Sequence, residues 1–296
     1  MTKETKKPFV VRFWGTRGSS PAPGPRTVRY GGNTSCTEVR VGGTLIIIDC
    51  GTGVRELGIS LMDEFQDKAI RGYIFIGHTH WDHIQGFPFF SPLYQSRNRF
   101  DIHSTRGSHH KSIERVLRGT MASDYFPVPL DKLACKLNFI EMNGCADLPG
   151  VKVCYHPLNH PGGAIGFRVE SQGRVLSYVS DHETVARQFG AGAKNLAKDK
   201  ALLDFVRGSD LFICEAQYSE AEYGTKKGWG HSTFNDVIDR AIAAEVKRLI
   251  LFHHDPTHDD ATVERMESEK FWTYAGCAAS IAIGVSRPRK RRSRSI

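Results

Sequence analysis

The hexapeptide HTHWDH, residues 78–83, places three imidazoles and one carboxylate within six positions, directly after an apolar, strand-like run. His78 and His80 are two residues apart, so both side chains can project from the end of that strand toward one side. Asp82 and His83 follow in the loop or in the first turn of a helix. Such groups need partners when they are buried, so the segment is unsuited to a core and predicts a metal site.

Three further strand-like runs each deliver a potential ligand. His160 closes VCYHPLNH, Asp181 follows the apolar run RVLSYVS, and His253 ends RLILFH. Taken singly, they also have structural interpretations, as a turn residue, a helix N-cap and a polar strand end. Together with the hexapeptide they complete a set of seven candidate ligands: His78, His80, Asp82, His83, His160, Asp181 and His253.

With these motifs the chain resembles the metallo-β-lactamase-fold superfamily of metallohydrolases, in the phosphodiesterase branch related to tRNase Z and PhnP. The resemblance extends from about Phe9 to Asp260. It implies an α/β fold, an αββα sandwich of two mixed β-sheets with helices on the outer faces and the site at the open edge between the sheets. The motifs that carry it are IIIDCGTG (46–53), HTHWDH (78–83), NH (159–160), SD (180–181) and LFHHDP (251–256).

The resemblance also implies a division of the ligands between two divalent ions. One ion is held by His78, His80 and His160, the other by Asp82, His83 and His253, and Asp181 bridges them. Imidazoles and carboxylates without a thiolate suit Zn²⁺, which we expect first, or Mn²⁺ or Fe. Such a pair can activate a shared hydroxide, which Asp82 would orient. Asp49 is expected to fix a ligand imidazole through a hydrogen bond.

The segment GHST (230–233) resembles a motif whose histidine, here His231, protonates the leaving oxygen. Loss of an alkoxide needs an acid, which favours this role. The alternative is that His231 merely precedes a helix capped by Ser232. Hydrolytic β-lactamases of this fold carry cysteine where this chain has Asp181, so β-lactam hydrolysis is disfavoured.

We expect the substrate to be a small phosphodiester, foremost a 3′,5′-cyclic nucleotide. A tRNA 3′-processing endonuclease of this family has a long, basic inserted arm, whereas the segment around 121–130 is short and barely charged. The alternatives are such an endonuclease or another RNA nuclease, a lactonase or thioesterase, and a non-catalytic protein with a relic site. None of the seven ligands is missing, which disfavours the relic.

The net charge of +8 is concentrated at the chain ends. Residues 287–296 carry six positive charges and residues 1–7 a net two, so the body is neutral. A domain that grips polyanions broadly carries its charge on a folded face. The basic tail is therefore expected to be a solvated end, with nucleic acid or an anionic membrane as possible contacts.

Several other residues have two interpretations. In the Gly- and Pro-rich opening, Arg17, Asn33, Thr34 and Ser35 either cradle a substrate phosphate or base, or form a structural loop. His254 and His258 either line the pocket or are exposed. The His109–His110 pair is expected at the surface.

Forty per cent hydrophobic and 24% charged residues are typical of a globular protein and exclude long disorder. Alternating strand and helix patterns predict one hydrolase domain over 8–270, followed by an apolar and then basic tail, 271–296. The apolar part of that tail, 271–286, is short for a membrane span. It predicts a buried terminal segment, or a weak surface anchor. The family resemblance suggests a homodimer.

Seven scattered cysteines form no CxxC pair. Cys50, Cys154 and Cys214 lie in or beside apolar runs, where a free thiol behaves as a small hydrophobic group. This usage indicates a reducing compartment. The start of the chain lacks a signal-peptide core and no run of 18 apolar residues occurs, so we expect a cytoplasmic enzyme.

Overall fold

A computed structural model describes residues 8–106, 112–271 and 280–283, and its core is a pair of β-sheets. The first sheet has the order β1-β2-β3-β4-β5-β6 and the second the order β13-β12-β11-β10-β9-β8-β7. The strands of the first are β1 (Phe9–Gly15), β2 (Cys36–Val41), β3 (Thr44–Ile48), β4 (Arg71–Phe75), β5 (Arg99–Ser104) and β6 (Lys136–Glu141). Those of the second are β7 (Cys145–Leu148), β8 (Val151–Leu158), β9 (Ala164–Ser171), β10 (Arg174–Val179), β11 (Leu211–Glu215), β12 (Arg248–Phe252) and β13 (Ser280–Ile283).

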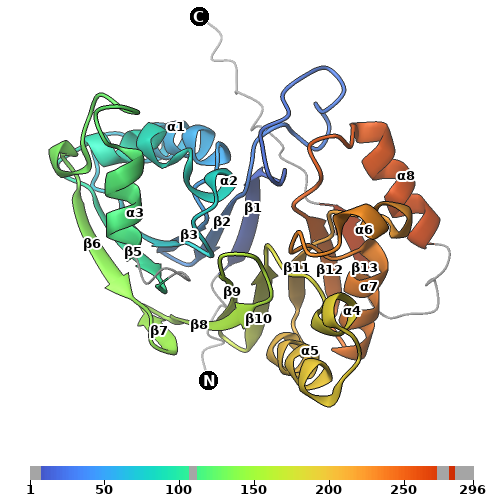
Figure 1. Cartoon of the computed structure of the whole chain (residues 1–296). Helices are drawn as coiled ribbons and strands as arrows, with labels where there is room; N and C mark the ends of the chain where they lie inside the picture. Colours follow the sequence, from blue (N-terminus) through green and yellow to red (C-terminus); the bar gives the residue numbers. More distant parts are fainter. Residues whose placement is uncertain (1–7, 107–111, 272–279, 284–296) are drawn as a thin grey trace, which may run out of the picture.

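Helices lie on the outer faces of both sheets (Figure 1). The first sheet is accompanied by α1 (Gly53–Phe65), α2 (Trp81–Ile84), α3 (Ile113–Thr120) and the 3₁₀ turns Phe87–Phe89, Ser91–Tyr94 and Leu130–Lys132. The second is accompanied by α4 (Val185–Phe189), α5 (Ala193–Val206), α6 (Glu220–Lys226), α7 (Phe234–Ala243) and α8 (Asp260–Phe271). The expected αββα sandwich of two mixed sheets is confirmed.

The alternation of side chains along the central strands produces this layering. In β3, Ile47 packs with Leu57 of α1 in the layer between sheet and helices. Its neighbours Ile46 and Ile48 point the other way, into the layer between the sheets that also contains Phe167 of β9. Successive strand residues face opposite sides, so a strand that is apolar throughout must be covered on both faces.

The parallel strands of each sheet determine where chemistry can occur. β3, β4, β5 and β6 run parallel in the first sheet, and β10, β11, β12 and β13 in the second. Their carboxyl ends meet at one edge of the sandwich, where polar residues that follow apolar strands are brought together. The segments after β3, β4, β10, β11 and β12 therefore share one edge.

The strand-like runs predicted before His78, His160, Asp181 and His253 form β4, β8, β10 and β12. The strand β5 was not predicted, because Asp101 and His103 interrupt its apolar pattern. The helix that follows His231 begins at Phe234, and its N-cap is Thr233, whose hydroxyl accepts a hydrogen bond from the Asp236 N–H. The expectation that Ser232 caps it is wrong.

The prediction that Cys154 is a free thiol is also wrong. Cys154 forms a disulfide with Cys145 across the antiparallel strands β7 and β8, where the two residues are in register. Cys50 and Cys214 are free and buried, as predicted.

Parts of the predicted organisation lie outside the described residues. These are the His109–His110 pair and the basic tail 287–296. Of the apolar run 271–286, residues Ser280–Ile283 form β13, which pairs with β12 in the second sheet. No helix in the described part of the chain combines the length and apolar character needed to cross a bilayer.

The contact between the sheets yields a stability prediction. Phe75 is fully buried, stacks on His103 with ring centroids 4.6 Å apart, and meets Phe167 edge-on at 5.5 Å. Phe75→Ala should lower the free energy of unfolding by about 3–5 kcal/mol through lost burial and a cavity. Urea denaturation measures this, with the exposed Tyr125→Ala expected to stay within about 0.5 kcal/mol. Equal losses in both variants would contradict the packing argument.

Candidate metal centre

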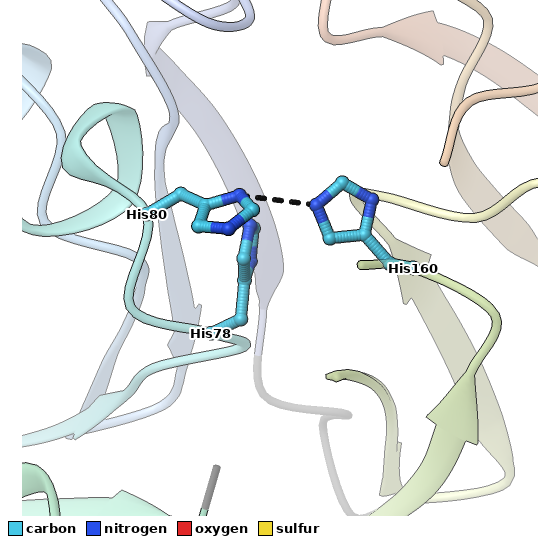
Figure 2. Close-up of side chains that lie close together, drawn as sticks. All are labelled: His78, His80 and His160. Atoms are coloured by element: carbon cyan, nitrogen blue, oxygen red, sulfur yellow. Dashed lines mark hydrogen bonds between the residues drawn. The ribbon is translucent and has the colours of Figure 1, made fainter. Parts of the chain in front are cut away.

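Three histidines from the two halves of the sandwich converge at the open edge. His78 and His80 lie in the segment after β4, and His160 follows β8 (Figure 2). Their candidate ligand atoms lie within 4.8 Å of one another. His160 Nε2 is 3.1 Å from His80 Nδ1. The structure thus brings together the three residues predicted for one ion.

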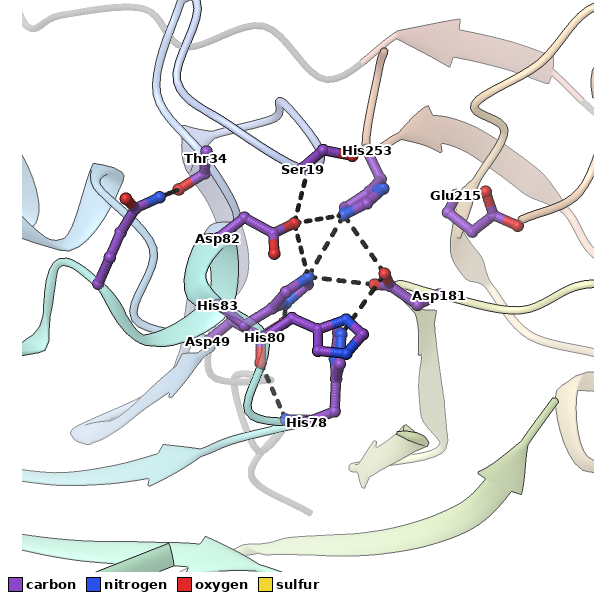
Figure 3. Close-up of polar contacts among 12 residues, drawn as sticks. Ser19, Thr34, Asp49, His78, His80, Asp82, His83, Asp181, Glu215 and His253 are labelled. Carbon is purple, nitrogen blue, oxygen red and sulfur yellow. Dashed lines mark hydrogen bonds and ion pairs between the residues drawn. The ribbon is translucent and has the colours of Figure 1, made fainter. Parts of the chain in front are cut away.

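A second group lies beside the first (Figure 3). It contains Asp82, His83, Asp181 and His253, all buried, again with candidate ligand atoms within 4.8 Å of one another. His253 Nε2 is 3.0 Å from Asp82 Oδ2 and 3.3 Å from His83 Nε2. These are the residues predicted for the other ion, together with the predicted bridge.

Asp181 lies between the two groups. Its Oδ2 is 3.6 Å from His78 Nε2 and 3.7 Å from His160 Nε2 on one side. The same carboxylate is 3.2 Å from His83 Nε2, through Oδ1, and 3.5 Å from His253 Nε2 on the other. A carboxylate in contact with both sets has the placement that a bridging ligand requires.

The donor set fits two divalent cations. Both ring nitrogens of His78 and Oδ1 of Asp181 are buried without a hydrogen-bond partner in the described structure. Two imidazole nitrogens each about 2.0–2.1 Å from a tetrahedral ion are about 3.3 Å apart, close to the two nitrogen–nitrogen distances found here. Buried polar atoms left without partners are costly, and a cation would satisfy them. The His and Asp clusters are consistent with a dinuclear metal site.

The electrostatics of the second group also favour positive charge. Burial lowers the pKa of His83, but Asp82, Asp181 and Asp49 around it raise it well above its usual value. Burial raises the pKa of Asp181, yet His253, His83 and His78 hold it well below its usual range. In the first group, burial above all lowers the pKa of His78. Its ring is therefore neutral, with a lone pair to offer a metal.

Three ligand imidazoles are oriented by acceptors behind them. His83 Nδ1 donates to Asp49 Oδ2 (2.9 Å), and His253 Nδ1 donates to Gln217 Oε1 (3.2 Å). His160 Nδ1 donates to the Gly230 carbonyl (2.9 Å). Each contact fixes the tautomer and leaves Nε2 free to bind a metal. Asp49 lies where its predicted role requires, whereas Gln217 and Gly230 were not predicted.

The backbone is held in an unusual conformation at these positions. Asp49 has φ 63° and His253 has φ 56°, each directly after a strand that ends at the preceding residue. The left-handed region is uncommon for residues other than glycine, and such outliers gather at functional sites. The turn redirects both side chains into the gap between the sheets.

His231 lies next to the metal centre and is buried. Its Nδ1 is 3.9 Å from Asp181 Oδ2 and 3.6 Å from Glu215 Oε2, which leaves Nε2 as the nitrogen available to the cleft. Burial lowers the pKa of His231 to about 4 and raises that of Glu215 well above its usual value. Glu215 ends the apolar strand β11 and was not predicted as a site residue, although a carboxylate after an apolar strand is the pattern that identified Asp181.

An open cleft of about 410 Å³ leads to the centre. It is lined by Ser19, Thr79, His80, Trp81, Asp82, Asp181 and His231. Ser19 donates its backbone N–H to Asp82 Oδ2 at 2.8 Å. Both predicted catalytic residues, Asp82 and His231, therefore face the space that a substrate would enter.

The residues considered for substrate contact lie elsewhere. Asn33 Oδ1 accepts from Thr52, and the Ser35 carbonyl accepts from Gly51, so both brace the loop between β3 and α1. Arg17 is buried and donates to the carbonyls of Gly31, Asp255 and His258, which makes it structural.

The histidines after His253 are also buried. His254 lies behind His253 near Tyr30, and burial lowers the pKa of its ring to about 3. The ring of His258 contacts Glu222 at 2.7 Å. His254 and His258 are not among the residues that line the cleft, so contact of Asn33, Ser35 or His254 with substrate stays a prediction.

A family model described as "Beta-lactamase superfamily domain" matches residues 44–254, most of the chain. The chain belongs to the metallo-β-lactamase superfamily. It is accordingly a metal-dependent hydrolase of that superfamily. Among curated relatives, the ribonuclease Z of Agathobacter rectalis is 27% identical, over 83% of this chain and 88% of that protein.

Solved structures show the same fold at low identity. The metallo-β-lactamase-fold protein YhfI from Bacillus subtilis superposes with a TM-score of 0.68, 16% identity, and coverage of 95% of this chain and 98% of that one. A diphosphatase of the PhnP family superposes with a TM-score of 0.64 and 17% identity, and the match covers 95% of this chain and 97% of that one. Unliganded yeast PDE1 superposes with a TM-score of 0.65 and 13% identity, and the match covers 94% of this chain and 97% of that one.

The close approach of Gly18 to His253 provides a test of the second metal position. A Cβ at Gly18 would lie 2.3 Å from His253 Nδ1. Gly18→Ala should therefore displace that ring and reduce the tightly bound metal from two ions per protein chain toward one. Metal analysis by mass spectrometry after dialysis measures this. Gly24→Ala in the same loop, where a Cβ meets nothing within 4 Å, is the matched control. Full metal content in Gly18→Ala would count against His253 as a ligand.

Proposed function

We propose that this chain is a dinuclear metal-dependent phosphodiesterase that hydrolyses a small phosphodiester, foremost a 3′,5′-cyclic nucleotide. The observation that supports it best is the bridging position of Asp181 between two complete His/Asp ligand groups beside an open cleft. The cleft volume of about 410 Å³ lies in the range of small-molecule sites. The neutral body of the chain also favours a small substrate over a polyanion.

Two divalent ions, zinc first and manganese or iron otherwise, supply a water of lowered pKa and neutralise charge on the phosphoryl oxygens when bound. His78, His80 and His160 would hold one ion, and Asp82, His83 and His253 the other, with Asp181 shared. Asp82 keeps its carboxylate at the cleft and is anchored by the Ser19 N–H, so it can accept a hydrogen bond from the attacking water and orient it.

His231 transfers a proton to the leaving oxygen. With a pKa near 4 its ring is neutral at pH 7, so it carries one proton, on Nε2 toward the cleft. When Nε2–H donates that proton, Nδ1 becomes basic and can take one from the Glu215 carboxyl, whose protonated form burial favours, once the two atoms close from 3.6 Å to hydrogen-bonding distance. The imidazole thereby remains neutral, and the negative charge of the departing alkoxide passes to Glu215.

An RNA 3′-processing nuclease is the second candidate, because the curated relatives that match include ribonucleases Z. In that case the basic segment 287–296 would contact the RNA backbone. Cleavage would then fall steeply with salt and with deletion of that segment, because phosphate contacts by Lys and Arg release counterions. Turnover of a cyclic nucleotide should tolerate both changes.

The deciding assay compares 3′,5′-cAMP, bis(p-nitrophenyl) phosphate and a 3′-extended tRNA as substrates of zinc- or manganese-loaded protein. We expect turnover of both small diesters, its loss in Asp181→Ala, and no tRNA cleavage. The exposed Asp147→Ala is the matched control and should retain activity. Efficient tRNA cleavage with inert cAMP would overturn the small-substrate proposal in favour of the nuclease.

The proton relay makes a separate prediction about leaving groups. His231→Ala should lower kcat for cAMP by about 10²-fold or more, because its 3′-alkoxide needs an acid. Glu215→Gln, which keeps the shape but cannot release the proton, should follow the same pattern. Both should change the rate with bis(p-nitrophenyl) phosphate far less, since nitrophenolate leaves unassisted. Equal losses on the two substrates would argue against the relay, and carboxylic-ester turnover that survives His231→Ala would instead support a lactonase or thioesterase.

A further inference from the structure

We propose that Trp81 is the stacking surface for the nucleobase of the substrate, so that the cleft selects nucleoside phosphodiesters over diesters without an aromatic ring. This inference rests on the proposed phosphodiesterase function and adds a subsite to it. It comes from the position of an exposed indole between two metal-site residues, His80 and Asp82.

Trp81 is exposed to solvent and is not part of the hydrophobic core. Its relative exposure is 61%, although tryptophan is large and mostly apolar. Of the other hexapeptide side chains, His78, Asp82 and His83 are buried, whereas Thr79 and His80 are exposed like Trp81. Trp81 also lines the cleft together with Asp181 and His231. A large aromatic surface in solvent at the mouth of a polar site is typical of a ligand contact.

The backbone that carries Trp81 is held firmly. The His83 N–H donates to the His80 carbonyl at 3.0 Å, and the Gln85 N–H donates to the Trp81 carbonyl at 2.7 Å. The short helix α2 is joined to the segment after β3 by a hydrogen bond from the Cys50 N–H to the His83 carbonyl at 2.7 Å. Stacking on Trp81 therefore has to order the two side-chain torsions of the indole but not the backbone that carries it.

The position of Trp81 also places it near a phosphate bound at the metal centre. Trp81 is one residue from each of two metal-site residues, so its Cα is about 3.8 Å from theirs. A phosphate at the metal centre would carry its ribose outward, toward the cleft wall that Trp81 forms. Every base has a π face, and stacking on an aromatic side chain contributes to binding regardless of hydrogen-bond pattern. Purines, with the larger face, should therefore bind more tightly than pyrimidines.

A second exposed indole lies near the centre and provides a competing interpretation. Trp229 is 57% exposed and precedes His231 by two residues. It does not line the cleft, and Lys226 Nζ lies 4.2 Å from its ring centroid. The structure thus favours Trp81, and the two indoles can be separated by mutation.

Steady-state kinetics with three diesters tests the subsite. The substrates are 3′,5′-cAMP, 3′,5′-cCMP and glycerophosphocholine, which lacks a ring. Trp81→Ala should raise KM for cAMP on the order of tenfold, raise KM for cCMP less, and leave kcat and the ringless diester nearly unchanged. Trp81→Phe should restore most of the affinity. The exposed Tyr125→Ala is the matched control and should behave as wild type.

Binding provides a readout independent of turnover. Adenosine 5′-monophosphate should quench tryptophan fluorescence of the metal-loaded protein, whereas ribose 5-phosphate should not, and Trp81→Ala should abolish the quenching. Equal weakening of all three diesters in Trp81→Ala, or a change in base preference that follows Trp229→Ala, would overturn the proposal. If the wild type hydrolyses no diester, the proposed function fails, and the fluorescence titration still decides whether Trp81 contacts a base.

Discussion

The interaction on which the rest of the site depends is the contact of one buried carboxylate, Asp181, with imidazoles from both halves of the sandwich. A buried carboxylate must be compensated by charge or hydrogen bonds. Asp181 has four imidazole nitrogens within 3.7 Å, and its Oδ1 has no hydrogen-bond partner in the described structure. Bound cations would take over the compensation that these imidazoles provide. The imidazoles come from strand ends in both sheets, so the site forms where the packed sheets bring those ends together.

The surrounding chain is shaped to permit this convergence. Gly18 lies against the ring of His253, and Gly230 lies against His160, where a Cβ would come within 2.2 Å of Nδ1. Asp49 and His253 adopt left-handed backbone angles, which cost on the order of 1 kcal/mol or more each. The mostly apolar strands before them, β3 and β12, are packed in hydrophobic layers on both faces and supply the stability that tolerates this strain.

The sequence predicted which side chains meet at the candidate metal centre, because their signals are local. HTHWDH contains four candidate ligands within six residues. Asp181 and His253 each follow an apolar strand whose packing does not require a polar residue there. Glu215 is likewise a polar residue at the end of an apolar strand, β11, so the same reasoning could have identified it. The Gly230 carbonyl and Gln217 could not be predicted in this way, because their roles depend on which segments the fold places behind His160 and His253. The Cys145–Cys154 pair likewise depends on strand register, which the sequence pattern does not determine.

The burial that positions His231 also limits what it can do alone. An imidazole with a pKa near 4 is almost wholly neutral at pH 7, and cations beside it would lower that pKa further. As an imidazolium it would be too scarce to act as the acid, whereas as a neutral ring it would become an anion on losing its proton. In the proposed relay Glu215 resolves this conflict, because burial raises its pKa and it lies on the Nδ1 side of the ring. A protonated Glu215 carboxyl behind a neutral imidazole would hold the proton that the leaving oxygen needs, and the two groups together would provide an acid that neither provides by itself.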